Sequence, residues 1–171
     1  MFLDFTAMEP RHAYQWMVAA IVPRPIAWVS TVSPDGRTNL APFSFFQGVT
    51  CNPPTLLFVP GNTRDGRKKD TLLNIEANRE FVVSLPSFAQ AEQMNATAAL
   101  LPYGESEFEA FGIAAAPSER VRPPRVAGAG VASSAPSCKS CRWAKARSRP
   151  TSSSAASSAP TFGRRSWAPM A

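Results

Sequence analysis

The sequence is poor in the residues that build metal sites and disulfide frameworks, and it has no long apolar run. One histidine and three cysteines in 171 residues do not make a disulfide framework. Two of the cysteines form the pair Cys138-x-x-Cys141, but no second pair and no nearby histidine complete a four-ligand zinc site, which favours chance spacing. No apolar run reaches the roughly 18 residues of a membrane span. We therefore expect neither a metal site nor a membrane partner.

Several motifs of nucleotide and nucleic-acid binding are absent as well. There is no Gly-x-Gly-x-x-Gly sequence and no phosphate loop, so a Rossmann domain or an NTPase has no support. Basic and aromatic residues are not interleaved as they are in nucleic-acid-binding modules. The first ten residues lack a basic stretch followed by an apolar one, which argues against a secretory signal and predicts, by default, a cytoplasmic location.

Charge is distributed unevenly along the chain. Residues 1–125 hold eleven basic and twelve acidic side chains, whereas residues 126–171 hold seven basic and no acidic ones. The net charge of +6 therefore comes from the C-terminal segment and does not indicate nucleic-acid binding by the rest. That segment also contains eleven serines and eleven alanines, with almost no aliphatic periodicity. This composition predicts a domain at 1–126 followed by an irregular or disordered tail at 127–171.

Hydrophobic patterning predicts strands with a few short helices. The apolar run at 26–29 is rich in branched and aromatic residues and suits a buried strand. A Pro-Asp-Gly turn at 33–36 leads to a returning strand at 38–46, which Pro42 interrupts or confines to a sheet edge. Other expected elements are a helix or strand entry at 11–22, loops at 47–54 and 60–69, strands at 55–59 and 80–85, and helices from Asp70 or Thr71 to Glu76, at 88–100 and at 106–110.

Several stretches occur in the order of one known family. The segment PRPIAWVSTVSPDGRTNLAPFSFF at 23–46 resembles the flavin reductase-like family of FMN-binding split barrels. Further matching stretches are KKDTLLNI at 68–75, EFVVSL at 80–85, EQMNATAALLPYGESEFEAFGI at 92–113 and APSERVRPPRV at 116–126. The resemblance implies a Greek-key split β-barrel, mainly β with short helices. It also implies a homodimer that binds FMN near its interface and reduces flavin with NADH or NADPH.

The resemblance and the residue chemistry together indicate a cofactor site. A flavin phosphate needs hydroxyls and positive charge, which Ser30, Thr31 and Lys69 supply, while Thr71 stands at an expected helix start that favours anions. The flavin ring needs small residues, aromatic faces and a few donors, which residues 39–46 provide. The predicted cofactor-binding residues are Trp28, Ser30, Thr31, Asn39, Ala41, Pro42, Phe43, Ser44, Lys69 and Thr71.

No catalytic acid, base or nucleophile is predicted, because hydride transfer from nicotinamide to flavin is the chemistry of the cofactors. Glu92 and Glu107 are interpreted as surface or capping residues, and Phe45 and Phe46 as core residues rather than ring contacts, because aromatic residues in strands usually pack. We thus predict an FMN-binding, NAD(P)H-dependent flavin reductase. The alternatives are an oxidoreductase that reduces another small acceptor, a non-catalytic flavin-binding protein, and a defective product without activity.

The tail departs from the resembled family, which has further barrel strands in that region. Codons for residues 137–146 and 152–158 can be chosen so that a shifted reading frame encodes strand-like sequences. We therefore hypothesise a frameshift near residues 126–133, which leaves the barrel incomplete at its C-terminus. Resequencing the coding DNA on independent clones tests this hypothesis.

Overall fold

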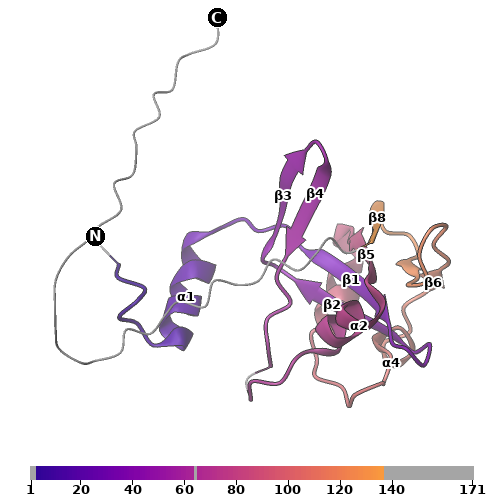
Figure 1. The fold of residues 1–171 in the computed structure, drawn as a ribbon, viewed down its shortest axis with the longest axis horizontal. Helices are drawn as coiled ribbons and strands as arrows, with labels where there is room; N and C mark the ends of the chain where they lie inside the picture. The colour runs from indigo at the N-terminus through magenta and orange to yellow at the C-terminus, as the bar shows by residue number, and fades with distance from the viewer. Residues whose placement is uncertain (1–2, 64, 137–171) are drawn as a thin grey trace, which may run out of the picture. The chain divides into compact units, whose positions relative to one another are not determined.

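The computed structural model describes residues 3–63 and 65–136, which form a mainly β unit with short helices (Figure 1). Its strands are β1 (Ala27–Val32), β2 (Thr38–Phe43), β3 (Phe46–Cys51), β4 (Pro54–Phe58), β5 (Glu80–Leu85), β6 (Ala115–Ala116), β7 (Arg125–Val126) and β8 (Val131–Pro136). Its helices are α1 (Pro10–Ala20), α2 (Asp70–Asn78), α3 (Ala91–Ala96) and α4 (Glu107–Ala110), with a 3-10 turn at Phe88–Gln90. None of these helices is long and apolar enough to cross a bilayer. The expected fold class is confirmed.

The central layer is an antiparallel four-stranded sheet in the order β2-β1-β5-β8. All six residues of β1 are buried, as expected for the apolar run that begins the hairpin. Val29 of β1 lies opposite Ala41 on one side and Val83 on the other. Because side chains alternate along a strand, Trp28 and Val29 point to opposite faces of this sheet.

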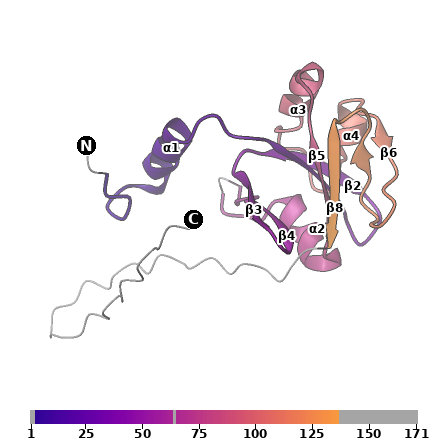
Figure 2. The same ribbon diagram turned by 90° about the horizontal axis from the view of Figure 1, so that it is seen from above.

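Each face of the sheet has its own hydrophobic cluster. On one face Trp28 and Leu40 pack with Phe108 and with Ile113 and Val126; we call this the α4 face. On the other, here the α2 face, a second cluster consists of Ala27, Val29, Phe43 and Val83, with Phe46, Phe58, Phe81 and Leu85 packed against it. Figure 2 shows α4 and β6 on one side of the sheet, and α2 with the β3–β4 hairpin on the other.

Most elements of the first hairpin follow the sequence expectation. The turn at 33–36 is present, with Gly36 at φ +87°, a left-handed conformation that glycine adopts without strain. Pro42 lies in β2, at the edge of the sheet, as expected.

The loop expected at 47–54 is wrong, because residues 46–51 form β3 and pair with β4. β3 has no regular alternation of apolar and polar residues and contains Gly48, so its pairing with β4 provides order that its own sequence does not predict.

The helices begin near their expected positions, but the N-cap of α2 and the C-terminal end of α3 differ from the expectation. α2 starts at Asp70, and its N-cap is Lys69, with no side-chain cap bond, so capping by Asp70 or Thr71 is wrong. The helix expected at 88–100 is shorter, because α3 ends at Ala96. The next residue, Thr97, is buried and accepts a hydrogen bond from the indole N–H of Trp28 (2.9 Å).

β8 is a correction to the expectation of irregular structure from residue 127 onward. It pairs with β5 over six residues, from Glu80 opposite Pro136 to Leu85 opposite Val131. Composition does not predict this strand, because its order comes from the backbone ladder offered by β5. The remaining predictions for the tail fall on residues 137–171, outside the described residues, so the domain boundary at 126 stays a prediction.

Candidate functional site

Two hydrogen bonds between side chains fasten α2 to the sheet. The Asn39 amide on β2 donates to the Thr71 hydroxyl (3.0 Å), and the Asn74 amide donates to the Thr31 hydroxyl on β1 (3.0 Å). All four residues are buried. The structure therefore brings together three predicted site residues, Thr31, Asn39 and Thr71, and engages their side chains in holding the helix against the α2 face.

The accessible members of the predicted site lie beside this junction. Ala41, Pro42, Ser44 and Lys69 are partly exposed, and Phe43 is buried next to them. The Lys69 ammonium lies 5.3 Å from the centroid of the Phe43 ring, a cation–π geometry. We call the surface formed by Ala41, Phe43, Ser44 and Lys69 the Lys69 face. Pro42 lies opposite Trp28, so strand alternation places it on the α4 face, away from these residues.

Lys69 is a cation without an ion-pair partner in the described part of the chain. Burial lowers the pKa of its ammonium, because the charged form loses hydration. It also stands at the N-cap of α2, where its carbonyl accepts the N–H groups of Leu72 and Leu73 and the positive end of the helix dipole lies. An anion at this position would compensate the lysine and meet the positive end of the helix dipole. The residues of the Lys69 face therefore fit the phosphate of a flavin nucleotide.

Trp28 and Ser30 do not belong to this cluster. Both are fully buried and lie on the α4 face, opposite to Thr31. The indole of Trp28 is in the core, and the hydroxyl of Ser30 donates to the Pro124 carbonyl. Both side chains are engaged within the protein, Trp28 with Thr97 and Ser30 with Pro124. Their role in cofactor binding stays a prediction that this geometry does not support.

The outer edge of β2 is covered by residues 104–107, which we call the edge clamp. The carboxylate of Glu107 accepts the backbone N–H of Leu40 (2.7 Å), and the hydroxyls of Ser106 and Thr38 are 2.6 Å apart. Gly104 lies across a shared pocket from Asp70, the first residue of α2. The clamp thus bonds to β2 and faces α2.

Glu107 is the residue that sequence reasoning missed. It is buried rather than on the surface, so the surface interpretation is wrong. Burial raises the pKa of its carboxyl, although the hydrogen bond from Leu40 acts in the opposite direction. Nothing in the Ser-Glu-Phe-Glu sequence distinguishes it from Glu109, which is exposed.

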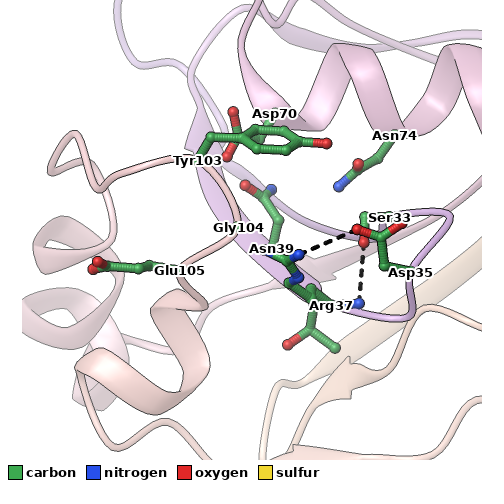
Figure 3. Close-up of a pocket in the computed structure, with 10 residues that line it drawn as sticks. Ser33, Asp35, Arg37, Asn39, Asp70, Asn74, Tyr103, Gly104 and Glu105 are labelled. Atoms are coloured by element: carbon green, nitrogen blue, oxygen red, sulfur yellow. Dashed lines mark hydrogen bonds and ion pairs between the residues drawn. The ribbon is translucent and has the colours of Figure 1, made fainter.

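A separate polar pocket lies between the β1–β2 turn, α2 and the 103–105 loop (Figure 3). Its lining residues are Ser33, Asp35, Arg37, Thr38, Asn39, Asp70, Asn74, Tyr103, Gly104 and Glu105. Arg37 is paired with Asp35 (3.2 Å), which leaves the carboxyls of Asp70 and Glu105 without a cation in the lining. Three carboxyls against one arginine make this lining unfavourable for a phosphate. Asp70 also begins α2, so at the Lys69 face the ammonium has to offset this carboxylate as well. Within residues 3–63 and 65–136 no metal-binding group of His, Cys, Asp or Glu forms.

Comparison with known proteins identifies the family. Residues 19–139 match the flavin reductase like domain. The chain belongs to this family. The matched region extends past residue 126 and includes β8, consistent with the pairing of that strand to the sheet.

Solved structures agree with this assignment. Component B of a nitrilotriacetate monooxygenase from Bacillus cereus is 32% identical, with a TM-score of 0.72, over 78% of this chain and 66% of that one. The 2-nitrobenzoate 2-nitroreductase NbaA of Pseudomonas fluorescens is 29% identical, with a TM-score of 0.68, over 78% of this chain and 64% of that one. A split-barrel protein of Shewanella frigidimarina, 23% identical with a TM-score of 0.65, over 78% of this chain and 67% of that one, shares the fold. The split-barrel expectation is confirmed.

The chain is shorter than its curated relatives. An uncharacterised protein of Deinococcus radiodurans is 44% identical over 144 residues, which cover 81% of this chain and 60% of that protein. A second, from Aquifex aeolicus, is 42% identical over 66% of this chain and 58% of that protein. The chain therefore spans about three fifths of the length of these two relatives.

Proposed function

We propose that this chain binds FMN on the Lys69 face and acts as a flavin reductase that uses NADH or NADPH. The observation that carries the proposal is the Lys69 ammonium, half-buried over Phe43 without an ion-pair partner among the described residues. Membership of the flavin reductase like domain family supports a flavin as the ligand. The choice of FMN over FAD, and of a nicotinamide as reductant, belongs to the proposal.

The residues of the Lys69 face have distinct tasks in this proposal. Lys69 and the first turn of α2 hold the phosphate through charge and backbone N–H groups. Ala41 permits close approach of a flat ring, and Ser44 offers a hydroxyl to a ring carbonyl or nitrogen. A bound flavin supplies the hydride-transfer chemistry, and the protein orients it and limits its contact with water.

Absorbance spectroscopy tests this function directly. The purified protein is titrated with FMN, and then NADH or NADPH is added under anaerobic conditions. We expect saturable binding and bleaching of the flavin band at about 450 nm, as in other flavin chemistry. Binding without bleaching by either nucleotide would support a non-catalytic flavin-binding protein, and no binding of FMN or FAD would refute the proposed function.

The variant Lys69→Ala tests the phosphate contact. Charge-assisted hydrogen bonds contribute roughly 1.5–3 kcal/mol, so we expect the Kd for FMN to rise at least about tenfold. Lys68→Ala is the matched control, because the Lys68 ammonium is paired with Glu76 (2.7 Å) and lies next in the chain. Riboflavin, which lacks the phosphate, should bind Lys69→Ala and the wild type alike. Equal FMN affinity of Lys69→Ala and the wild type would exclude Lys69 from the site.

A second candidate function is the reduction of another small acceptor by a flavin that stays bound. The likeness to NbaA, a 2-nitrobenzoate 2-nitroreductase, favours this alternative. Steady-state oxidation of NADH, with either free FMN or a nitrobenzoate as acceptor, separates the two. Turnover with the nitroaromatic alone would replace the flavin reductase proposal.

We also propose an isologous homodimer whose interface lies beside the 23–46 hairpin and includes the β3–β4 hairpin. Val49, Leu56 and Leu57 on β3 and β4 are 59%, 43% and 44% exposed. Leu56 and Leu57 follow each other in β4, so both faces of this hairpin expose apolar side chains, as is typical of a segment that a partner covers. Light scattering is expected to give twice the chain mass, and Leu57→Lys to shift it toward the monomer. A monomeric wild type that binds FMN tightly would refute the dimer.

The alternative of a defective, frameshifted product is tested by the same measurements on a version restored in frame. Aggregation and absence of flavin in the present chain, with recovery of both properties in the restored version, would establish it. Equal flavin binding by both versions would refute it. The cytoplasmic location stays a prediction.

A further inference from the structure

The edge clamp carries an inference about how the cofactor site is held in shape, and this inference rests on the proposed function. We propose that Glu107 is a positioning residue: by accepting the Leu40 N–H, it holds β2 in the place that aligns Ala41 and Ser44 with Lys69. Glu107 lies in α4, and the cofactor residues lie in β2 and at the start of α2.

The contact acts on the backbone between two predicted site residues. Leu40 stands between Asn39, which bonds to Thr71 of α2, and Ala41, which belongs to the Lys69 face. β2 is an edge strand, so the Leu40 N–H has no neighbouring strand on that side. The Glu107 carboxylate, 2.7 Å away, is the acceptor that takes the place of such a strand. A shift of Leu40 would therefore move the residues on both sides of it.

The rest of the clamp holds the same strand and faces the start of the helix. Ser106 bonds to Thr38 two residues before Leu40. Gly104 lines the same pocket as Asp70, the residue after Lys69. The clamp faces α2 across this pocket at Gly104, while Phe108, next to Glu107, packs in the cluster of the α4 face. One short segment thus bonds to the strand that carries Ala41 and lines a pocket with the helix start that carries Lys69.

A buried carboxylate in this role is not explained by packing alone. Burying a charge is unfavourable unless it makes strong hydrogen bonds, and an apolar side chain of similar size would fill the same space. Such a side chain would leave the Leu40 N–H without an acceptor. The exposed Glu109 in the same helix makes no such contact and provides an internal control.

Three full-length variants test the proposal. Glu107→Asp keeps the charge but withdraws it by about 1.5 Å, the length of one carbon–carbon bond. Glu107→Gln keeps the length and an acceptor oxygen without the charge. Glu109→Ala removes a carboxylate from the same helix. Each is compared with the wild type by FMN titration, by visible circular dichroism of the bound flavin, and by hydrogen exchange of the 38–43 segment.

We expect Glu107→Asp to weaken FMN binding about tenfold, to change the flavin dichroism and to speed exchange in the segment by a similar factor. Glu107→Gln should stay within about threefold of the wild type in its Kd for FMN and in its exchange rate. Glu109→Ala should not differ from the wild type in either quantity. Both variants at position 107 are polar and close in size to glutamate, so folding is retained.

Two results would overturn the proposal. One is wild-type FMN affinity and dichroism in Glu107→Asp together with faster exchange, because β2 would then be held without positioning the cofactor. The other is unchanged exchange in Glu107→Asp, because β2 would then not depend on this contact. Failure of the proposed function is recognised separately, since the wild type itself would then bind no flavin.

Discussion

The two edge strands of the central sheet, β2 and β8, are held in place by different kinds of contact. The outer edge of β2 is closed by the edge clamp, in which a buried carboxylate accepts a strand N–H. β8 pairs with β5, and the described part of the chain contains no second partner for it. The first edge is specified by side chains from a distant segment, and the second by its backbone ladder alone.

The difference shows what an edge strand requires. Unpaired N–H and C=O groups on an edge invite pairing with other chains unless they are covered or charged. On β2, Pro42 removes one donor and Glu107 engages another. β8 is built from small residues, and its Val131 is 54% exposed. Ala41, which we propose as a cofactor contact, lies on the closed edge strand.

The largest effect is expected from breaking the closed edge. Glu107→Ala leaves the Leu40 N–H without its acceptor and opens a small cavity, so the free energy of unfolding should fall by about 2–3 kcal/mol. Urea unfolding at neutral pH measures it. Glu109→Ala, in the same helix but exposed, should change stability by less than about 0.5 kcal/mol. Equal effects of the two variants would show that Glu107 does not close the edge.

The second prediction concerns the ladder of β8. Alternate N–H groups of an antiparallel edge strand point toward the partner or away from it. Of the adjacent variants Ser133→Pro and Ser134→Pro, one should therefore lose a bond to β5 and about 1–2 kcal/mol, and the other distinctly less. Thermal unfolding of both gives the comparison. Two equally mild variants would mean that β8 contributes little to the sheet.

The third prediction uses the raised pKa of Glu107. A carboxyl with a higher pKa in the folded state binds its proton more tightly there, so the stability that it contributes falls as pH rises through the folded pKa. The neighbouring Asp70, whose pKa is also raised, is common to both proteins that are compared. The unfolding free energy of the wild type is compared with that of Glu107→Gln at each pH. The difference, wild type minus variant, should decrease from pH 4.5 upward. A difference that increases over this range would contradict the prediction.

The smallest effect is expected at an exposed ion pair near β8. Arg122 lies 3.0 Å from Glu80, the first residue of β5, and its side chain is 57% exposed. Exposed pairs contribute about 0–1 kcal/mol and are screened by salt. Arg122→Ala should thus destabilise by less than about 1 kcal/mol at low salt, and by less still at 0.5 M salt, where the Debye length is only about 4 Å. A larger, salt-independent loss would place this pair on a level with the buried Glu107 contact.

Local patterns predicted the elements whose own residues specify them. The apolar run of β1, the Pro-Asp-Gly turn and the strand at 80–85 are where the sequence places them. α2 also starts at Asp70, as the sequence predicts, but its N-cap is Lys69 and not the expected Asp70 or Thr71. β3 and β8 were missed because their order comes from pairing with a partner strand rather than from their own pattern.

For the candidate site, the sequence predicts the residue types, and the structure decides which of them lie together. The residue types that suit a flavin phosphate and ring can be recognised in the sequence, and Lys69 and the end of β2 do lie side by side. The sequence does not tell which face of the sheet each of them occupies. One-residue alternation sends Ser30 into the α4 face and Thr31 into the α2 face, so neighbours in the motif are separated in space.

By itself, the sequence determined the family, the β1–β2 hairpin and the chemistry available for an anion. Only the tertiary structure decided that Glu107, and not Glu109, is buried against Leu40, and that Lys69 lies over Phe43. The physical reason is that burial and hydrogen bonding depend on which groups meet across the fold. Identical side chains two positions apart in one short helix therefore take opposite roles.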